Sequence, residues 1–192
     1  MKKSQFCALS AAAVIGLALT STAASAAVRG TVPSSTPDPT TVTFTVGSGL
    51  LTMTAPDSVV LLPPAGTDTA LPGTTVSAVM GDTFVTDDRA LLDATWTATA
   101  LSSTFVTGTH TTDETIPAAD ASYDPGTITE TAGIFLAAPI GTAVTLSATA
   151  QTVVTANADG DNVATWDALL SVAIPTTAVL GGYTGTLTQS VS

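Results

Sequence analysis

The stretch ATWTATALSSTF (94–105) sets a single tryptophan in a run of threonines and alanines, and residues 95–100 of it alternate with a two-residue period. One face of an extended chain here would carry Trp96, Ala98 and Ala100, and the other Thr95, Thr97 and Thr99. Because successive side chains of a strand point to opposite faces, this pattern predicts a strand with one buried and one hydrated face. We expect Trp96 to fill the core beside its small neighbours. The alternative is a ring that stacks on sugars or faces a second motif at a binding site.

The same period recurs along the chain, in TVTFTV (41–46), TWDALLSVAI (165–174) and YTGTLTQSV (183–191). Residues typical of turns separate these segments: Gly47–Gly49, Pro63–Pro64, Pro72–Gly73, Asp124–Gly126, Asp159–Gly160 and Gly181–Gly182. Strands at this spacing, with no helical pattern between them, predict an all-β fold, an antiparallel immunoglobulin-like β-sandwich. We expect one such domain over residues 41–192.

The first 26 residues have the features of a secretory signal peptide. Lys2 and Lys3 precede a mostly apolar run, 6–19, and Ala24-Ser25-Ala26 supplies the small residues of a cleavage site. We therefore expect cleavage after Ala26 and a secreted protein. Residues 27–40, rich in Pro, Ser and Thr, then form an extended leader.

Composition narrows the chemistry of the secreted part. Cys7 is the single cysteine and lies in the signal peptide, so the mature protein has no thiol, disulfide or cysteine metal site. The whole chain carries 15 acidic against 4 basic residues, a net charge of −11. Such a chain repels phosphate backbones and anionic lipids, which argues against nucleic acid or membrane partners after cleavage.

Few catalytic arrangements remain after cleavage. No lysine is left, His110 is the single histidine, and no G-x-S-x-G motif is present. His110 lies among threonines and is expected to be exposed and uninvolved. Carboxylates that could pair for glycoside hydrolysis are Glu114 and Glu130, or Asp87, Asp88 and Asp93. Only 5% of residues are aromatic, which disfavours a sugar cleft, so we predict no enzyme and no catalytic residues.

Two short polar segments have local explanations. ANADGDN (156–162) offers oxygen ligands to calcium, but it lacks the closing glutamate of an EF-hand. A hairpin turn at Asp159-Gly160 is the preferred interpretation, with no metal or cofactor. In Asp87-Asp88-Arg89 we expect a local ion pair that closes a strand end.

Several segments together resemble the WxL-domain-like secreted surface proteins of high-GC Gram-positive bacteria. They are VTDDRALLDATWTATA (85–100), IPAADASYDPG (116–126), AQTVVTA (150–156) and IPTTAVLGGYTGTLTQSV (174–191). Trp96-Thr97 matches the start of the proximal W-x-L motif, with Ala98 in place of its leucine. Tyr183, Leu187 and Thr188 match the distal motif, with Gln189 in place of its tryptophan.

The resemblance implies non-covalent attachment to the cell wall, with peptidoglycan as ligand and Trp96, Thr97, Tyr183, Leu187 and Thr188 as binding residues. Tyr183 also follows a glycine turn before the last strand, like the corner tyrosine of immunoglobulin-like sandwiches, which bonds to upstream backbone. The alternative function is a structural or assembly subunit that contacts other secreted proteins through strand edges and Thr-rich faces. A glycoside hydrolase is a distant third.

Overall fold

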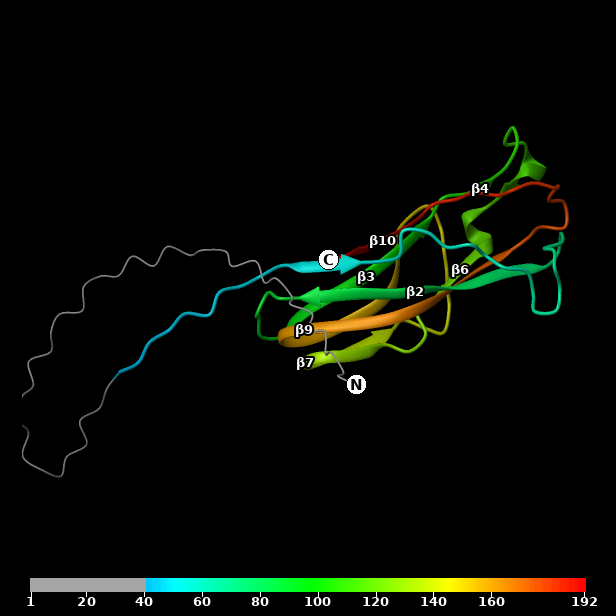
Figure 1. The fold of residues 1–192 in the computed structure, drawn as a ribbon. Helices are drawn as coiled ribbons and strands as arrows, with labels where there is room; N and C mark the ends of the chain where they lie inside the picture. The colour runs from blue at the N-terminus through cyan, green and yellow to red at the C-terminus, as the bar shows by residue number, and fades with distance from the viewer. Residues whose placement is uncertain (1–40) are drawn as a thin grey trace, which may run out of the picture. The chain divides into compact units, whose positions relative to one another are not determined.

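The computed structural model describes residues 41–192; the expected signal peptide (1–26) and leader (27–40) lie outside the described residues. The described part is built of strands, with two single-turn 3-10 helices, η1 (Thr112–Glu114) and η2 (Ala118–Asp120) (Figure 1). The strands are β1 (Leu51–Thr54), β2 (Thr75–Asp87), β3 (Ala94–Ser102), β4 (Phe105–Val106), β5 (Thr115–Ile116), β6 (Ala121–Asp124), β7 (Thr129–Pro139), β8 (Val144–Thr145), β9 (Gln151–Ala173) and β10 (Leu187–Val191). All their pairings are antiparallel, which confirms the predicted all-β antiparallel fold.

The long strand β9 organises the sheet. Along one edge of β9, the first half of the strand pairs with β3, and the pair nearest the middle of β9 is Ala94↔Ala158. The second half pairs with β2, and the pair nearest the middle is Asp87↔Asn162. β7 and β6 pair with the opposite edge. β10 extends the sheet beyond β3, and β1 extends it beyond β2. The strands therefore form two layers, β1-β2-β9 and β9-β3-β10, that share β9.

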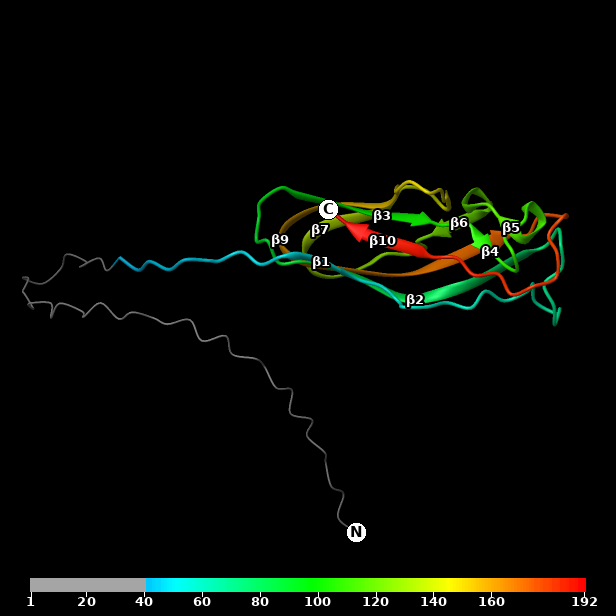
Figure 2. The ribbon, with the colours of Figure 1, turned by 90° about the horizontal axis from the view of Figure 1, so that it is seen from above.

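β9 passes from one layer to the other at residues 159–161, where Gly160 has a φ of +68° (Figure 2). The 88–93 loop between β2 and β3 is bonded to this bend: Gly160 N–H donates to Leu91 O (2.8 Å), and Asp93 N–H donates to Asp159 Oδ1 (2.7 Å). We call the bend and this loop the corner. The expected hairpin turn at Asp159-Gly160 is therefore wrong. The chain does bend there, but the two flanking halves of β9 pair with β3 and β2 and not with each other.

The core lies between the layers and follows the predicted period. Even-numbered residues of β9 from Val154 to Val172 are buried, except Gly160 at the bend. They pack with Trp96, Ala98 and Ala100 from β3 and with Val85 from β2. The TWDALLSVAI and TWTATAL segments are thus strands with the orientation that their sequences predict.

One expected strand is not formed. Residues 41–50 belong to no strand, and Val42, Phe44 and Val46 are exposed. Backbone pairing within the described residues begins at Gly49, whose N–H donates to Asp88 O. Residues 44–192 cluster as one compact unit, and no helix among residues 41–192 is long and apolar enough to cross a membrane.

Candidate functional site

The pairing of β3 with β10 brings the two predicted motifs together. Val191 lies opposite Ala98, Gln189 opposite Ala100 and Leu187 opposite Ser102. Beyond the end of β10, Thr97 and Ser192 exchange two backbone hydrogen bonds of 2.8 and 3.1 Å. The Trp96-Thr97 segment and the last strand are thus neighbours, although about ninety residues separate them in the sequence.

Trp96 is a core residue with 1% of its surface exposed. Its indole Nε1–H donates to Oδ1 of Asn162 across the corner (3.3 Å), and Asn162 is itself fully buried. Asn162 Nδ2–H in turn donates to Gly160 O (3.3 Å). The geometry supports the core interpretation of Trp96, because a ring buried in this way offers no face on which a sugar can stack.

The predicted ion pair lies beside this tryptophan. Asp87 is fully buried and accepts two hydrogen bonds of 2.8 Å from the guanidinium of Arg89, and a third of 3.1 Å from the Arg89 backbone. Arg89 also donates to Thr95 O (3.0 Å). These bonds outweigh the effect of burial and hold the pKa of Asp87 below its usual value. The Asp87–Arg89 pair therefore fixes the start of β3, as an ion pair at a strand end was expected to do.

Tyr183 has the structural role predicted for a corner tyrosine. Its hydroxyl lies 3.0 Å from the carbonyl oxygens of Val179 and Asp113 and accepts a hydrogen bond from Val179 N–H (3.2 Å). Val179 is four residues upstream, so the bond goes back along the chain as in immunoglobulin-like sandwiches. The other two distal residues are on β10, where Leu187 packs against the core and Thr188 is exposed.

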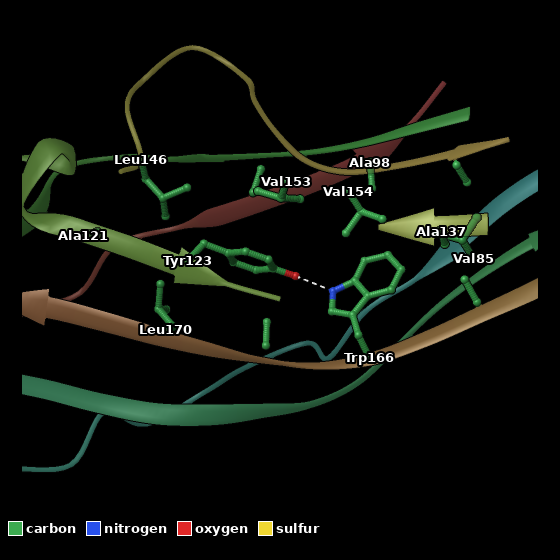
Figure 3. Close-up of a cluster of buried hydrophobic side chains, with 14 of the residues drawn as sticks. Val85, Ala98, Ala121, Tyr123, Ala137, Leu146, Val153, Val154, Trp166 and Leu170 are labelled. Carbon is green, nitrogen blue, oxygen red and sulfur yellow. Dashed lines mark hydrogen bonds between the residues drawn. The ribbon is translucent and has the colours of Figure 1, made fainter. Parts of the chain in front are cut away.

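Gln189 is the partly buried end of a polar chain that starts in the core and that sequence reasoning missed. Trp166 Nε1–H donates to the Tyr123 hydroxyl (2.8 Å; Figure 3). This hydroxyl in turn donates to Gln189 Oε1 (2.7 Å). The chain links β9, β6 and β10. Burial raises the pKa of Tyr123 to about 12, against the opposing effect of its hydrogen bonds. The two-residue period places Gln189 on the inner face of the strand with Leu187. This period was the sequence feature that could have indicated an inward-facing glutamine in need of a hydrogen-bond partner.

The outer face of the β9-β3-β10 layer is uncharged and rich in hydroxyl groups, and it also carries Leu101, which lies opposite Thr188. We call it the hydroxyl face; its polar members are Thr95, Thr97, Thr99, Thr155, Asn157, Thr188, Ser190 and Ser192. Register aligns these side chains across the strands, since Thr97 lies opposite Thr155 and Thr99 opposite Ser190. The hydroxyls of Thr99 and Ser190 are 2.9 Å apart. The layer formed by β2 and β9 differs, with Asp82, Phe84 and Asp167 on its outer face.

Three of the five predicted candidate carboxylates, Glu114, Glu130 and Asp87, accept hydrogen bonds from nearby groups, whereas Asp88 and Asp93 take part through their backbones. Glu114 accepts four hydrogen bonds from the backbone and hydroxyls of Thr109 and Thr111, which lower its pKa to about 2. Glu130 accepts a hydrogen bond from Ala137 N–H (2.6 Å). Asp87 is paired with Arg89, as described above.

A different carboxylate pair, which the sequence did not indicate, is formed across strands. Asp82 on β2 lies opposite Asp167 on β9. The pKa of Asp167 is raised above its usual value. The largest cause is the loss of hydration; the hydrogen bond with Asp82 and the negative charge of Asp82 are smaller causes. Both residues line a shallow hollow with Thr127, Thr129 and Thr165. No group of three or more His, Cys, Asp or Glu side chains that could hold a metal ion occurs among residues 41–192.

His110 is exposed, as expected, and lines a second hollow with Thr112, Pro117, Asp120 and Pro175. Its φ of +66° is unusual for a residue other than glycine. No nucleophilic serine is bonded to it in the described structure.

Comparison with protein-family models, with curated proteins and with solved structures gave no significant match.

Proposed function

We propose that the protein is a non-catalytic extracellular surface protein that associates non-covalently with the cell wall, through the glycan strands of peptidoglycan. Its extracellular location rests on the signal-peptide pattern of residues 1–26. The single observation that supports glycan binding is the hydroxyl face, an uncharged polar surface on a strongly acidic chain.

The chemistry of this face suits a polysaccharide. Hydroxyl and amide side chains donate and accept hydrogen bonds, as do the hydroxyl and acetamido groups of a wall glycan. Uncharged groups also avoid the large desolvation cost that a carboxylate would incur on contact with a sugar surface. Eight such side chains at regular strand spacing present a ladder to a linear polymer.

This proposal changes the role of the residues that the WxL resemblance implies. Trp96, Tyr183 and Leu187 hold β3 and β10 in place through core packing and backbone hydrogen bonds. Thr97 and Thr188 have side chains on the hydroxyl face, so they are the two members of the set that would touch the ligand. The motif then acts by building the surface.

Binding to purified cell wall, measured by co-sedimentation, tests the proposal. Thr155→Glu with Thr188→Glu adds two charges to the hydroxyl face, and Thr52→Glu with Thr75→Glu adds the same two charges at exposed strand positions of the other layer. We expect the first pair to lose wall binding and the second to retain it, with equal melting temperatures. A parent protein that stays in the supernatant, or two variants that bind equally, would overturn the proposal.

A second candidate function is an assembly subunit that contacts other secreted chains through strand edges. The exposed alternating segment 41–46 favours it, because its apolar side chains have no partner among the described residues.

A further inference from the structure

Within residues 41–192 the main sheet has one long open edge. The two ends of the strand order, β1 and β10, lie side by side and cover each other. On the other side of β9, β8 is an edge of two residues, whereas β7 has eleven. β9 is the one strand of the described chain that pairs with β7, so the second side of β7 is open. The free N–H and C=O groups of such an edge can pair with another chain.

Two backbone features of β7 oppose such pairing. Its register with β9 shifts twice between residues 130 and 134, so this part of the edge is bulged. Ile140 N–H donates to Val153 O of β9 (3.0 Å). Because the N–H groups of an antiparallel strand alternate between its two sides, the nitrogen of Pro139 faces the open side. Proline has no N–H, so an added strand finds no donor at this position.

Glu130 closes the next donor position. By the same alternation, Ala137 N–H faces the open side of β7. Glu130 Oε1 accepts a hydrogen bond from this N–H (2.6 Å). The carboxylate therefore occupies the place that a carbonyl oxygen of an added strand would take. Glu130 also lies opposite the buried Ala164, so it is an inward-pointing charge on an edge strand, which is a known protection against pairing.

The Glu130–Ala137 bond also connects the two layers. Glu130 is next to the second half of β9, whereas Ala137 lies opposite Ala156 in the first half. A strand that paired with β7 would have to displace this charge-assisted hydrogen bond and cover the carboxylate. Both steps are unfavourable, because a charge that is removed from water needs a new partner.

We propose that Glu130 is an autoinhibitory guard: its bond to Ala137 N–H prevents β7 from pairing with β7 of a second copy. The same edge on both copies can form an antiparallel pair about a two-fold axis, so loss of the guard gives a closed dimer. This inference is independent of wall binding. It also limits the assembly function, since pairing through β7 requires displacement of the carboxylate.

Sedimentation velocity of the secreted protein tests the guard. Glu130→Ala removes the acceptor and its charge, and Asp68→Ala is the matched control, which removes an exposed charge from the loop between β1 and β2. We expect the parent and Asp68→Ala to stay monomeric. Glu130→Ala should dimerise, with self-association tighter by roughly tenfold, the change that corresponds to one charge-assisted hydrogen bond. A folded Glu130→Ala protein that stays monomeric, or an Asp68→Ala protein that dimerises equally, would overturn the inference.

A second substitution locates the contact on β7. Ala137→Pro, added to Glu130→Ala, removes the donor that the guard had covered, so the double variant should return to the monomer. A double variant that dimerises as strongly as Glu130→Ala would contradict pairing at β7. Circular dichroism and melting temperatures confirm that each variant is folded.

Glu130→Gln takes the place of Glu130→Ala if the alanine variant does not fold. The glutamine side chain keeps a carbonyl oxygen for Ala137 N–H, but the neutral bond is weaker than the charge-assisted one. We therefore expect Glu130→Gln to dimerise more than Asp68→Ala. Equal sedimentation of these two variants would contradict the guard.

Discussion

The two tryptophans of the chain have similar burial but different surroundings. Trp96 lies at the corner, where its partner Asn162 is next to the Asp87–Arg89 ion pair. Trp166 lies in the second half of β9, where its partner Tyr123 is bonded to Gln189 in a neutral chain. One ring supports a point where strands change layers, and the other ties three strands together inside the core. The comparison shows that the same inward position on an alternating strand can be stabilised by an amide next to an ion pair or by a chain of neutral hydrogen-bonding groups.

Truncation of either ring tests the shared part of this comparison. Trp96→Ala and Trp166→Ala each remove a large buried side chain and are expected to cost ~3–5 kcal/mol in the free energy of unfolding. The matching Phe variants keep most of the volume and should cost less. Urea denaturation measures all four. A Trp96→Ala protein of full stability would show that this ring is not part of the core.

Asp87→Ala tests the charged surroundings of Trp96. It removes a fully buried carboxylate and leaves the Arg89 guanidinium without its partner, at an expected cost of ~1.5–3 kcal/mol. Because the pKa of Asp87 is lowered in the folded protein, its contribution is fully present above the unfolded pKa and is lost as pH falls through the folded value. Melting temperatures at falling pH should therefore converge for parent and variant. A gap that stays constant down to the lowest pH would contradict this account.

Tyr123→Phe tests the neutral surroundings of Trp166. It leaves the indole N–H and the Gln189 oxygen without their partner, at an expected cost of about 1–2 kcal/mol. A pKa raised to about 12 means that the unfolded tyrosine ionises first, so the parent loses stability as pH rises from about 10 towards 12. The Phe variant should lack this part of the alkaline loss. Denaturation curves at neutral and alkaline pH check both statements.

Glu114→Gln lies outside both tryptophan regions and should have the smallest effect. Glu114 is partly exposed and organises the 109–114 loop through four hydrogen bonds. Its pKa of about 2 means that the charged form holds the loop at neutral pH and releases it as pH falls from the usual glutamate value towards 2. Amide hydrogen exchange at Thr109 and Thr111 should rise in the variant. Unchanged protection at both amides would show that the carboxylate does not order the loop.

The sequence predicted those features that depend on neighbouring residues. The inward position of Trp96, a local ion pair within the segment 87–89 and the backbone bond of Tyr183 are all confirmed, and the structure selects Asp87 as the partner of Arg89. Each depends on the two-residue period or on residues within a few positions. The predicted strand at 41–46 has the same period but is not formed, because a strand also needs an edge with which to pair.

The partners of the buried polar groups were beyond sequence reasoning. Asn162 is 66 positions from Trp96, and Gln189 is 66 positions from Tyr123, and no local pattern selects such pairs. The hydroxyl face could not be predicted from the sequence either, because its side chains come from three strands that are far apart in the chain. β3, β9 and β10 each contribute a few polar residues that are ordinary for a strand. Only their register makes a continuous uncharged surface.

By itself the sequence determined an all-β chain, the side of each strand that faces the core, and a strongly acidic composition, because these follow from side-chain period and charge. The tertiary structure alone decided that Asp159-Gly160 joins two layers and not a hairpin. It also decided that Gln189 bonds to Tyr123 and that residues 41–46 stay unpaired. The physical reason is that backbone hydrogen bonds between strands are indifferent to sequence. The choice of partner therefore depends on which pairing closes one core, and this is a property of the whole chain.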